Sequence, residues 1–282
     1  MSTPALRNCA FCLLAPILFF ALLPTVSVSG AEQKTAPANP NPPPLEKAGL
    51  VLTFDDRNFD DWLAALPLFD QYGVKATFFI SGPIDEKALA TCRQLVAHGH
   101  AIGSHSVHHL KAVEYVREHS IEDYLRQEIQ PQLDAWRAAG ISVTSFAFPS
   151  SSSDAATESA LLKVFRHLRI GGPMAPGDRL SDRDPFFTPL AQVPTRGALP
   201  SKGIDYAPTR EDRTFEQLDA ALTRAATRGE ILTLYAHGIR HLGGKGHFIT
   251  PHALEHLFLK ARELKLAFYT FDQLPGSALL SE

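Results

Sequence analysis

From residue 48 onward, short apolar runs of strand length alternate with longer segments in which apolar residues recur at helical spacing. Strands that alternate with helices favour parallel pairing through right-handed crossovers. Both a closed (β/α) barrel and an open doubly wound sheet satisfy this pattern, but no Gly-x-Gly-x-x-Gly motif follows the first run, which disfavours dinucleotide binding. The expected strands are 49–54, 75–80, 101–103, 145–148, 168–171, 192–195, 231–235 and 267–270, and the expected helices are 61–72, 86–98, 121–139, 155–165, 214–228 and 251–264.

Helix boundaries and loop composition refine this alternation. Asp85, and Thr250 followed by Pro251, are residues that favour the start of a helix. The region 172–209 is rich in Pro, Gly and Asp, and we expect long loops there around one short strand. The chain has 282 residues, of which 45% are hydrophobic, enough for a single domain, which we assign to residues 47–276.

The beginning of the chain differs from the rest. Arg7 precedes an apolar stretch from Cys9 to Leu23, and small residues follow. This pattern is typical of a secretory signal peptide, which we assign to residues 1–31; an uncleaved N-terminal anchor is the alternative. The apolar stretch is shorter than the roughly 20 residues of a membrane span, so we expect a secreted or periplasmic mature form without a stable span. Residues 32–46 are rich in proline and are assigned as a linker.

Charge and cysteine content narrow the possible functions. The formal net charge is −3 and both signs are mixed along the chain, so the sequence lacks the concentrated basic patch of a nucleic-acid-binding surface. Of three cysteines, Cys9 and Cys12 lie in the predicted signal peptide. Cys92 is then alone in the mature chain, which excludes an internal disulfide and favours a small buried residue on a helix.

Residue types that bind metals or transfer protons follow three of the expected strands. Asp55 and Asp56 close the first strand, His105 and His109 follow the third, and His237 follows a later one. In barrels the chemistry gathers at the C-terminal ends of the strands, so these side chains can meet. On one helical turn the two histidines His105 and His109 would share a face, and with one carboxylate they would leave a ligand position open, as catalytic zinc sites do. His237 could act as an acid or base near neutral pH.

These residues stand in motifs that resemble those of the polysaccharide deacetylase family, the proteins that share the NodB homology domain (carbohydrate esterase family 4). Thr53-Phe54-Asp55-Asp56 matches the family's first motif, His105-Ser106-Val107-His108-His109 matches its H-S/T-x-x-H motif, and Leu234-Tyr235-Ala236-His237 is similar to its late motif. Val74–Phe79 and Phe268–Leu274 are similar to further family strands, so the resemblance spans about residues 48–274. It implies a single-domain α/β fold, a distorted (β/α) barrel with about seven strands.

The resemblance also implies a role for each residue. Asp56, His105 and His109 would bind Zn²⁺, or another divalent ion such as Co²⁺ or Mn²⁺. Water bound to that metal would attack an acetyl carbonyl of an acetylated polysaccharide or oligosaccharide, with Asp55 as general base. His237 would be the general acid that protonates the leaving group, which we expect to be the nitrogen of an N-acetyl group.

The third family motif departs from its usual R-x-P-Y-G pattern. The matching stretch reads Ala147-Phe148-Pro149-Ser150-Ser151, so Ala147 replaces the arginine that pairs with the catalytic base in the family. The backbone N–H of Ser150, next to Pro149, can still serve as the oxyanion donor. We hypothesise that Arg57 or Arg240 substitutes for the missing arginine; the alternative is that both lie on the surface or bind substrate.

Two further questions stay open at this point. The family's aspartate that orients the late histidine has no clear match, and Asp182 and Asp184 are candidates in the right interval. The altered third motif also leaves other functions possible. These are an O-acetyl polysaccharide esterase, an amidase on a small amide, and a catalytically inactive sugar-binding domain.

Overall fold

The computed structural model describes residues 42–205, 211–243 and 245–276, without the side chains of 211–214. The predicted signal peptide and most of the predicted linker lie outside these residues, so both assignments stay predictions. Among the described residues, no helix combines the length and the apolar character needed to cross a membrane.

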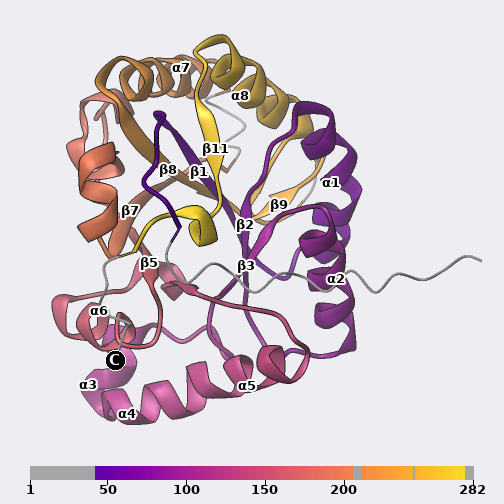
Figure 1. The fold of residues 1–282 in the computed structure, drawn as a ribbon, viewed down its shortest axis with the longest axis vertical. Helices are drawn as coiled ribbons and strands as arrows, with labels where there is room; N and C mark the ends of the chain where they lie inside the picture. Colours follow the sequence, from indigo (N-terminus) through magenta and orange to yellow (C-terminus); the bar gives the residue numbers. More distant parts are fainter. Residues whose placement is uncertain (1–41, 206–210, 244, 277–282) are drawn as a thin grey trace, which may run out of the picture. The chain divides into compact units, whose positions relative to one another are not determined.

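Seven parallel strands close into a barrel, because β8 pairs with β1 as well as with β7 (Figure 1). This is the predicted barrel with about seven strands. Every residue of β1 from Gly49 to Asp55 is buried, as expected for a parallel strand that is covered on both faces. In order around the ring the strands are β1 (Gly49–Asp56), β2 (Thr77–Ile80), β3 (Ala101–Ser104), β4 (Ser145–Ala147), β5 (His167–Gly171), β7 (Ala198–Gly203) and β8 (Glu230–Ala236).

The ring is distorted at β1. The first half of this strand, Gly49–Val51, pairs with β11 (Ala267–Tyr269), whereas the second half, Thr53–Asp56, pairs with β2. Both neighbours therefore share one edge of β1, while β8 occupies the other edge. Outside the ring, β6 (Phe187–Pro189) runs antiparallel to β8, and β9 (Gly238–Ile239) and β10 (Phe248–Ile249) form a small second sheet.

Helices surround the barrel strands (Figure 1). The predicted start signals are confirmed: Asp85 accepts a hydrogen bond from the backbone N–H of Ala88 at 2.8 Å, and Thr250 accepts one from Ala253 at 3.1 Å. The helices are α1 (Phe59–Tyr72), α2 (Glu86–Ala97), α3 (Ala112–Glu118), α4 (Ile121–Tyr124), a π-helical turn (Leu125–Ile129), α5 (Gln130–Ala138), α6 (Ala155–Leu161), α7 (Glu211–Arg228) and α8 (Pro251–Glu263).

The predicted strand 192–195 is wrong, and the described part of the region 172–209 contains two strands, β6 and β7, instead of the one that we predicted. The segment 192–195 belongs to a 3₁₀ helix, Leu190–Thr195, and β7 follows it. Pro200 and neighbouring Ser, Lys and Gly residues hid β7, since these residues are depleted in strands. Pro200 is tolerated because β7 pairs with β8 only from Lys202 onward. The short helix α3 was also not predicted.

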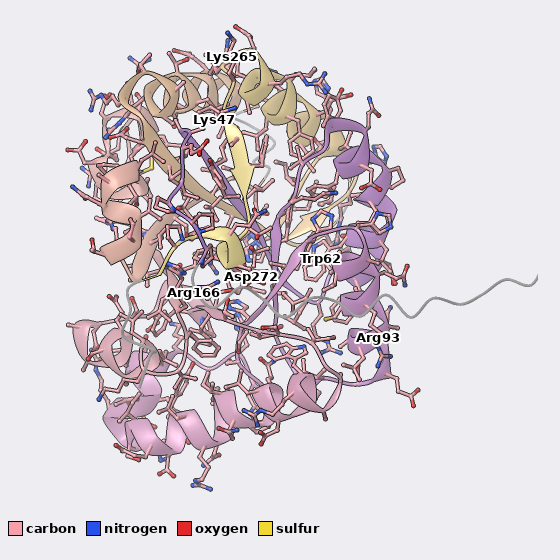
Figure 2. The ribbon with its side chains drawn as sticks, in the orientation of Figure 1. Lys47, Trp62, Arg93, Arg166, Lys265 and Asp272 are labelled. Atoms are coloured by element: carbon pink, nitrogen blue, oxygen red, sulfur yellow. The ribbon has the colours of Figure 1, made fainter. Side chains whose placement is uncertain are left out.

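The core lies between the barrel strands and the helices. Trp62, labelled in Figure 2, is fully buried, and its ring centre lies 5.0 Å from that of Phe78 on β2, whereas Arg93 and Lys265 lie on the outside. Cys92 is also fully buried on α2, and burial raises the pKa of its thiol to about 12. This agrees with a packing role rather than a reactive thiol.

Candidate metal centre and acid–base site

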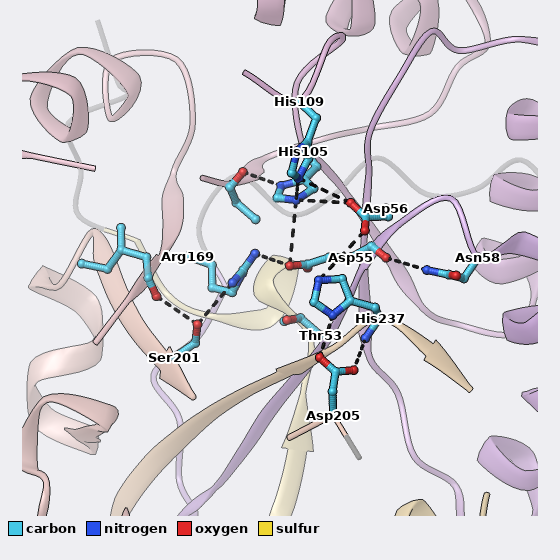
Figure 3. Close-up of polar contacts among 12 residues, drawn as sticks. Thr53, Asp55, Asp56, Asn58, His105, His109, Arg169, Ser201, Asp205 and His237 are labelled. Carbon is cyan, nitrogen blue, oxygen red and sulfur yellow. Dashed lines mark hydrogen bonds and ion pairs between the residues drawn. The ribbon is translucent and has the colours of Figure 1, made fainter. Parts of the chain in front are cut away.

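The two carboxylates that end β1 face one site because the backbone turns between them (Figure 3). Successive side chains of a strand point to opposite faces, but Asp56 has a left-handed backbone with φ of 82°. Such a conformation costs a non-glycine residue about 1–3 kcal/mol and is a common feature of functional sites. Asp55 is 2% exposed, whereas the side chain of Asp56 is 39% exposed.

The two histidines of the second motif lie on a bent loop after β3, not on the helical turn that we predicted. Ser106 and His109 have left-handed backbones, with φ of 63° and 55°. These two bends, rather than a helical repeat, bring the side chains together. The ring centres of His105 and His109 are 4.8 Å apart and their Nε2 atoms are 3.2 Å apart.

Asp56, His105 and His109 meet the requirements of a shared metal ion. Oδ1 of Asp56 lies 3.7 Å from Nε2 of His105 and 3.5 Å from Nε2 of His109. Two atoms that bind a tetrahedral zinc ion at about 2.05 Å are roughly 3.3 Å apart, close to these separations and to the 3.2 Å between the two nitrogens. The residues present therefore fit a divalent ion.

The environment of His105 prepares it for such a ligand role. Its Nδ1–H donates to the backbone oxygen of Ala147 at 2.8 Å, which leaves the lone pair on Nε2, toward Asp56. Burial, followed by the nearby charge of Arg169, lowers the pKa of His105 to about 3. The imidazole is therefore neutral at physiological pH, as a metal ligand must be.

Asp55 is paired with Arg169 on β5. The guanidinium donates a short hydrogen bond to Oδ2 of Asp55, and both side chains are almost fully buried. Burial raises the pKa of Asp55, and the charge of Arg169 opposes that increase. Oδ1 of Asp55 has no hydrogen-bond partner among the described residues. The pair thus leaves one carboxylate oxygen free to accept a proton.

Arg169 pairs with Asp55 in place of the arginine that the third motif lacks. In the pairing of β4 with β5, Arg169 lies directly opposite Ala147, so the guanidinium comes from the neighbouring strand at the same height. The hypothesis that Arg57 or Arg240 substitutes is wrong, because Arg57 binds Asp85 at 2.7 Å and Arg240 binds Asp61 at 2.6 Å. The sequence signal for this role is the single charged residue, Arg169, inside the apolar run 168–171.

His237, the residue after β8, is oriented by Asp205 (Figure 3). Its Nδ1–H donates to Oδ2 of Asp205 at 2.7 Å, and its backbone N–H donates to Oδ1 of the same residue at 3.0 Å. Nε2 then points toward Asp56, 4.0 Å from its Oδ2. Burial lowers the pKa of His237, but the hydrogen bond and charge of Asp205, together with Asp55 and Asp56, outweigh it and raise the pKa above its ordinary value.

The two aspartates proposed from the sequence for this role lie elsewhere. Asp184 binds Arg224 at 2.8 Å, and Asp182 accepts a hydrogen bond from Ser181 at 3.1 Å. Asp205 was missed because it follows β7, the strand that was itself missed. A correctly placed β7 would have added an aspartate at a fourth strand end.

We expect Asp205→Asn to lose activity at a lower alkaline pH than the unaltered protein. A raised pKa keeps His237 protonated to higher pH, so losing the negative partner lowers that pKa and moves the alkaline limb of the kcat/KM profile to lower pH. We also expect kcat to fall, at most by the factor of about 10² to 10⁴ that a positioned acid contributes. Asp182→Asn is the matched control, and an unchanged alkaline limb in Asp205→Asn would contradict this role for Asp205.

Pro149 and Ser150 form a 3₁₀ turn with Ser151, directly after β4. Ser150 has φ of 53°, a left-handed backbone like those of Asp56 and His109. Ala147, two residues before this turn, holds His105 through its carbonyl, which places the turn beside the site. The role of the Ser150 N–H as an oxyanion donor stays a prediction.

Comparison with known proteins identifies relatives of this chain. A family model described as polysaccharide deacetylase matches residues 43–164. A stretch of 72 residues is 39% identical to YxkH of Bacillus subtilis (strain 168), provisionally named a polysaccharide deacetylase; it covers 24% of this chain and 25% of that relative. The match thus spans about a quarter of the curated relative.

Solved structures share the fold at low sequence identity. The chitin deacetylase from the fungal pathogen Colletotrichum lindemuthianum has a TM-score of 0.54 and 19% identity, covering 83% of this chain and 90% of its own. The Xyl-CE4 domain of a multidomain xylanase from the hindgut metagenome of Trinervitermes trinervoides has a TM-score of 0.51 and 20% identity, covering 81% and 89%. The chain is similar to the polysaccharide deacetylase family over residues 43–164, the segment that contains the first motif and the two-histidine motif.

Proposed function

We propose that this protein is a metal-dependent hydrolase that removes acetyl groups, first of all N-acetyl groups, from a polysaccharide or oligosaccharide outside the cytoplasm. One observation carries the proposal. Three donor atoms of Asp56, His105 and His109 surround one point, and two separately supported proton-transfer groups, Asp55 and His237, flank it. Ligands, a base and an acid are the parts that metal-assisted hydrolysis requires.

The chain's own residues divide the proton transfers between them. A bound divalent ion would polarise the acetyl carbonyl and acidify a water molecule. Asp55 accepts the proton of the attacking water on Oδ1, while Arg169 holds Oδ2 and fixes the direction of the carboxylate. His237 donates its Nε2 proton to the leaving nitrogen, and Asp205 keeps the ring charged and oriented until then. The Ser150 N–H is the candidate donor to the developing oxyanion.

The proposal predicts acetate release that depends on an added metal. We expect metal-stripped protein to be inactive on chitooligosaccharides, peptidoglycan fragments and acetylated xylan, and Zn²⁺, Co²⁺ or Mn²⁺ to restore release. His105→Ala should abolish both stoichiometric metal binding and activity. His98→Ala, which removes an exposed histidine paired with Asp70, should change neither. The measurement is acetate released over time, alongside bound metal per chain.

The choice of substrate separates the proposal from its alternatives. Release from acetylated xylan alone would favour an O-acetyl esterase, and release from small amides alone would favour an amidase. Binding of acetylated oligosaccharides without acetate release in the metal-loaded protein would favour an inactive sugar-binding domain and contradict the proposed reaction.

A further inference from the structure

The loop that carries the two histidine ligand candidates is strained and exposed to water on one side. Ser106 and His109 both have left-handed backbones, a conformation that costs a non-glycine residue about 1–3 kcal/mol. His109 is exposed, and the side chain of His108 is 64% exposed. Since the histidine rings must keep fixed positions, other residues have to hold this loop from its buried side.

One face of the α4–α5 segment lies under the loop. Tyr124, Glu128, Gln132 and Trp136 follow each other at intervals of four residues, and all four are almost fully buried. In a regular α-helix, four residues overshoot one turn by about 40°, so three such steps would rotate the last side chain well away from the first. The wider π-helical turn Leu125–Ile129 offsets this rotation, and π turns are frequent at functional sites.

Gln132 joins the loops after β2 and β3. Its Nε2 lies 2.6 Å from the backbone oxygen of Gly82 and 3.0 Å from that of Ser106, and its Oε1 accepts a hydrogen bond from Ser104 at 2.8 Å. Ser104 and Ser106 are the residues on either side of His105. A single buried amide therefore contacts both neighbours of this ligand candidate, through the Ser104 hydroxyl and the Ser106 backbone oxygen.

Glu128 holds the residue before the second ligand candidate. Its carboxylate accepts hydrogen bonds from the backbone N–H of His108 at 2.8 Å and from the His108 ring at 2.5 Å, although Glu128 itself is fully buried. Its backbone oxygen accepts a further bond from Val107 at 3.0 Å. Tyr124 completes the row by donating to the backbone oxygen of Leu110 at 3.2 Å. A buried carboxylate is costly unless it is paired, and among the described residues the hydrogen-bond partners of this carboxylate belong to the histidine loop.

We propose that Glu128 and Gln132 are positioning residues that preorganise His105 and His109 for metal binding, an inference that rests on the metal-dependent function proposed above. Their hydrogen bonds go to the ends of β2 and β3 and to the loops that follow them, and not to the ligand atoms of His105 and His109. They act by holding the strained backbone of residues 104–108 in the one conformation that brings the two Nε2 atoms together. Without them, the binding energy of the metal has to order the loop, and the metal affinity falls.

The test measures zinc affinity in the whole protein by competition with a coloured chelator. We expect Glu128→Leu and Gln132→Leu to raise the Kd for Zn²⁺ by about 10- to 100-fold, the usual effect of losing a residue that supports a ligand. Glu128→Gln keeps an acceptor for the His108 N–H and should lie between Glu128→Leu and the unaltered protein. The visible absorption of the Co²⁺-loaded variants should also change, because ligand geometry sets that spectrum.

Matched controls separate this effect from a general loss of stability. Gln127→Ala changes an exposed residue of the same π turn and should leave the Kd unchanged. All titrations are made well below the unfolding temperature of each metal-free variant, and Glu128→Gln decides the question where a leucine variant does not fold. Kd values within twofold of the unaltered protein would overturn the positioning role. If the unaltered protein does not bind zinc, or if His105→Ala still binds it, the proposed function would be overturned instead.

Discussion

Replacing Asp55 with Asn is expected to lower kcat for acetate release by about 10²- to 10⁴-fold, the usual contribution of a positioned general base. Asparagine has nearly the same shape and can still accept a hydrogen bond from Arg169, but it cannot take a proton from water. The ligand candidates Asp56, His105 and His109 are untouched, so the Kd for Zn²⁺ should stay close to that of the unaltered protein. The measurement is kcat together with zinc affinity on the same preparations.

The pH profile adds an independent check on this base. Because burial raises the pKa of Asp55, the acidic limb of the kcat/KM profile should lie above the pH range of an ordinary carboxyl group. In Asp55→Asn, the residual activity should lose this limb. Asp60→Asn, which removes an exposed carboxylate nearby in the sequence, serves as the control. Full activity in Asp55→Asn would exclude Asp55 as the base.

Replacing Arg169 with Ala is expected to damage both stability and activity. The change leaves the carboxylate of Asp55 buried and unpaired, and breaking a buried ion pair in this way costs about 3–5 kcal/mol of unfolding free energy. Loss of the positive charge also raises the pKa of Asp55 further, so the acidic limb moves to higher pH and kcat near neutral pH falls. Denaturant unfolding and the pH profile measure the two effects separately.

A second substitution tests the origin of this charge. Ala147 lies opposite Arg169 in the pairing of β4 with β5, so the double variant Ala147→Arg, Arg169→Ala should regain part of both the stability and the activity. Arg57→Ala, which removes contacts with Asp85, two nearby carbonyls and the ring of Phe59, should keep kcat unchanged. Loss of activity in Arg57→Ala as large as in Arg169→Ala would contradict this account.

The sequence predicts the barrel well because its signals are local. Apolar runs such as that of β1 and capping residues such as Asp85 and Thr250 report directly on the elements that contain them. β7 was not predicted because it depends on non-local contacts. Its residues have poor strand propensity, and only its neighbours β5 and β8 in the closed ring make it a strand.

The candidate site divides in the same way. Asp55, Asp56, His105, His109 and His237 stand out because they follow strands, and the structure brings all five together. Their supports, Arg169 and Asp205, come from parts of the chain far from their partners. The left-handed turns at Asp56 and His109 depend on the surrounding packing, which no residue pattern announces.

The pairing of Ala147 with Arg169 bears on how such sites diverge over time. In a closed ring, each strand has two neighbours, so a side chain lost from one strand can be restored from another at the same height. The same point in space can then receive a positive charge from either of two sequence positions, such as 147 and 169, that lie far apart in the chain. A linear motif describes only one of these two strands. A chain with the arginine on the neighbouring strand therefore lacks the motif, although the candidate base still has an arginine partner.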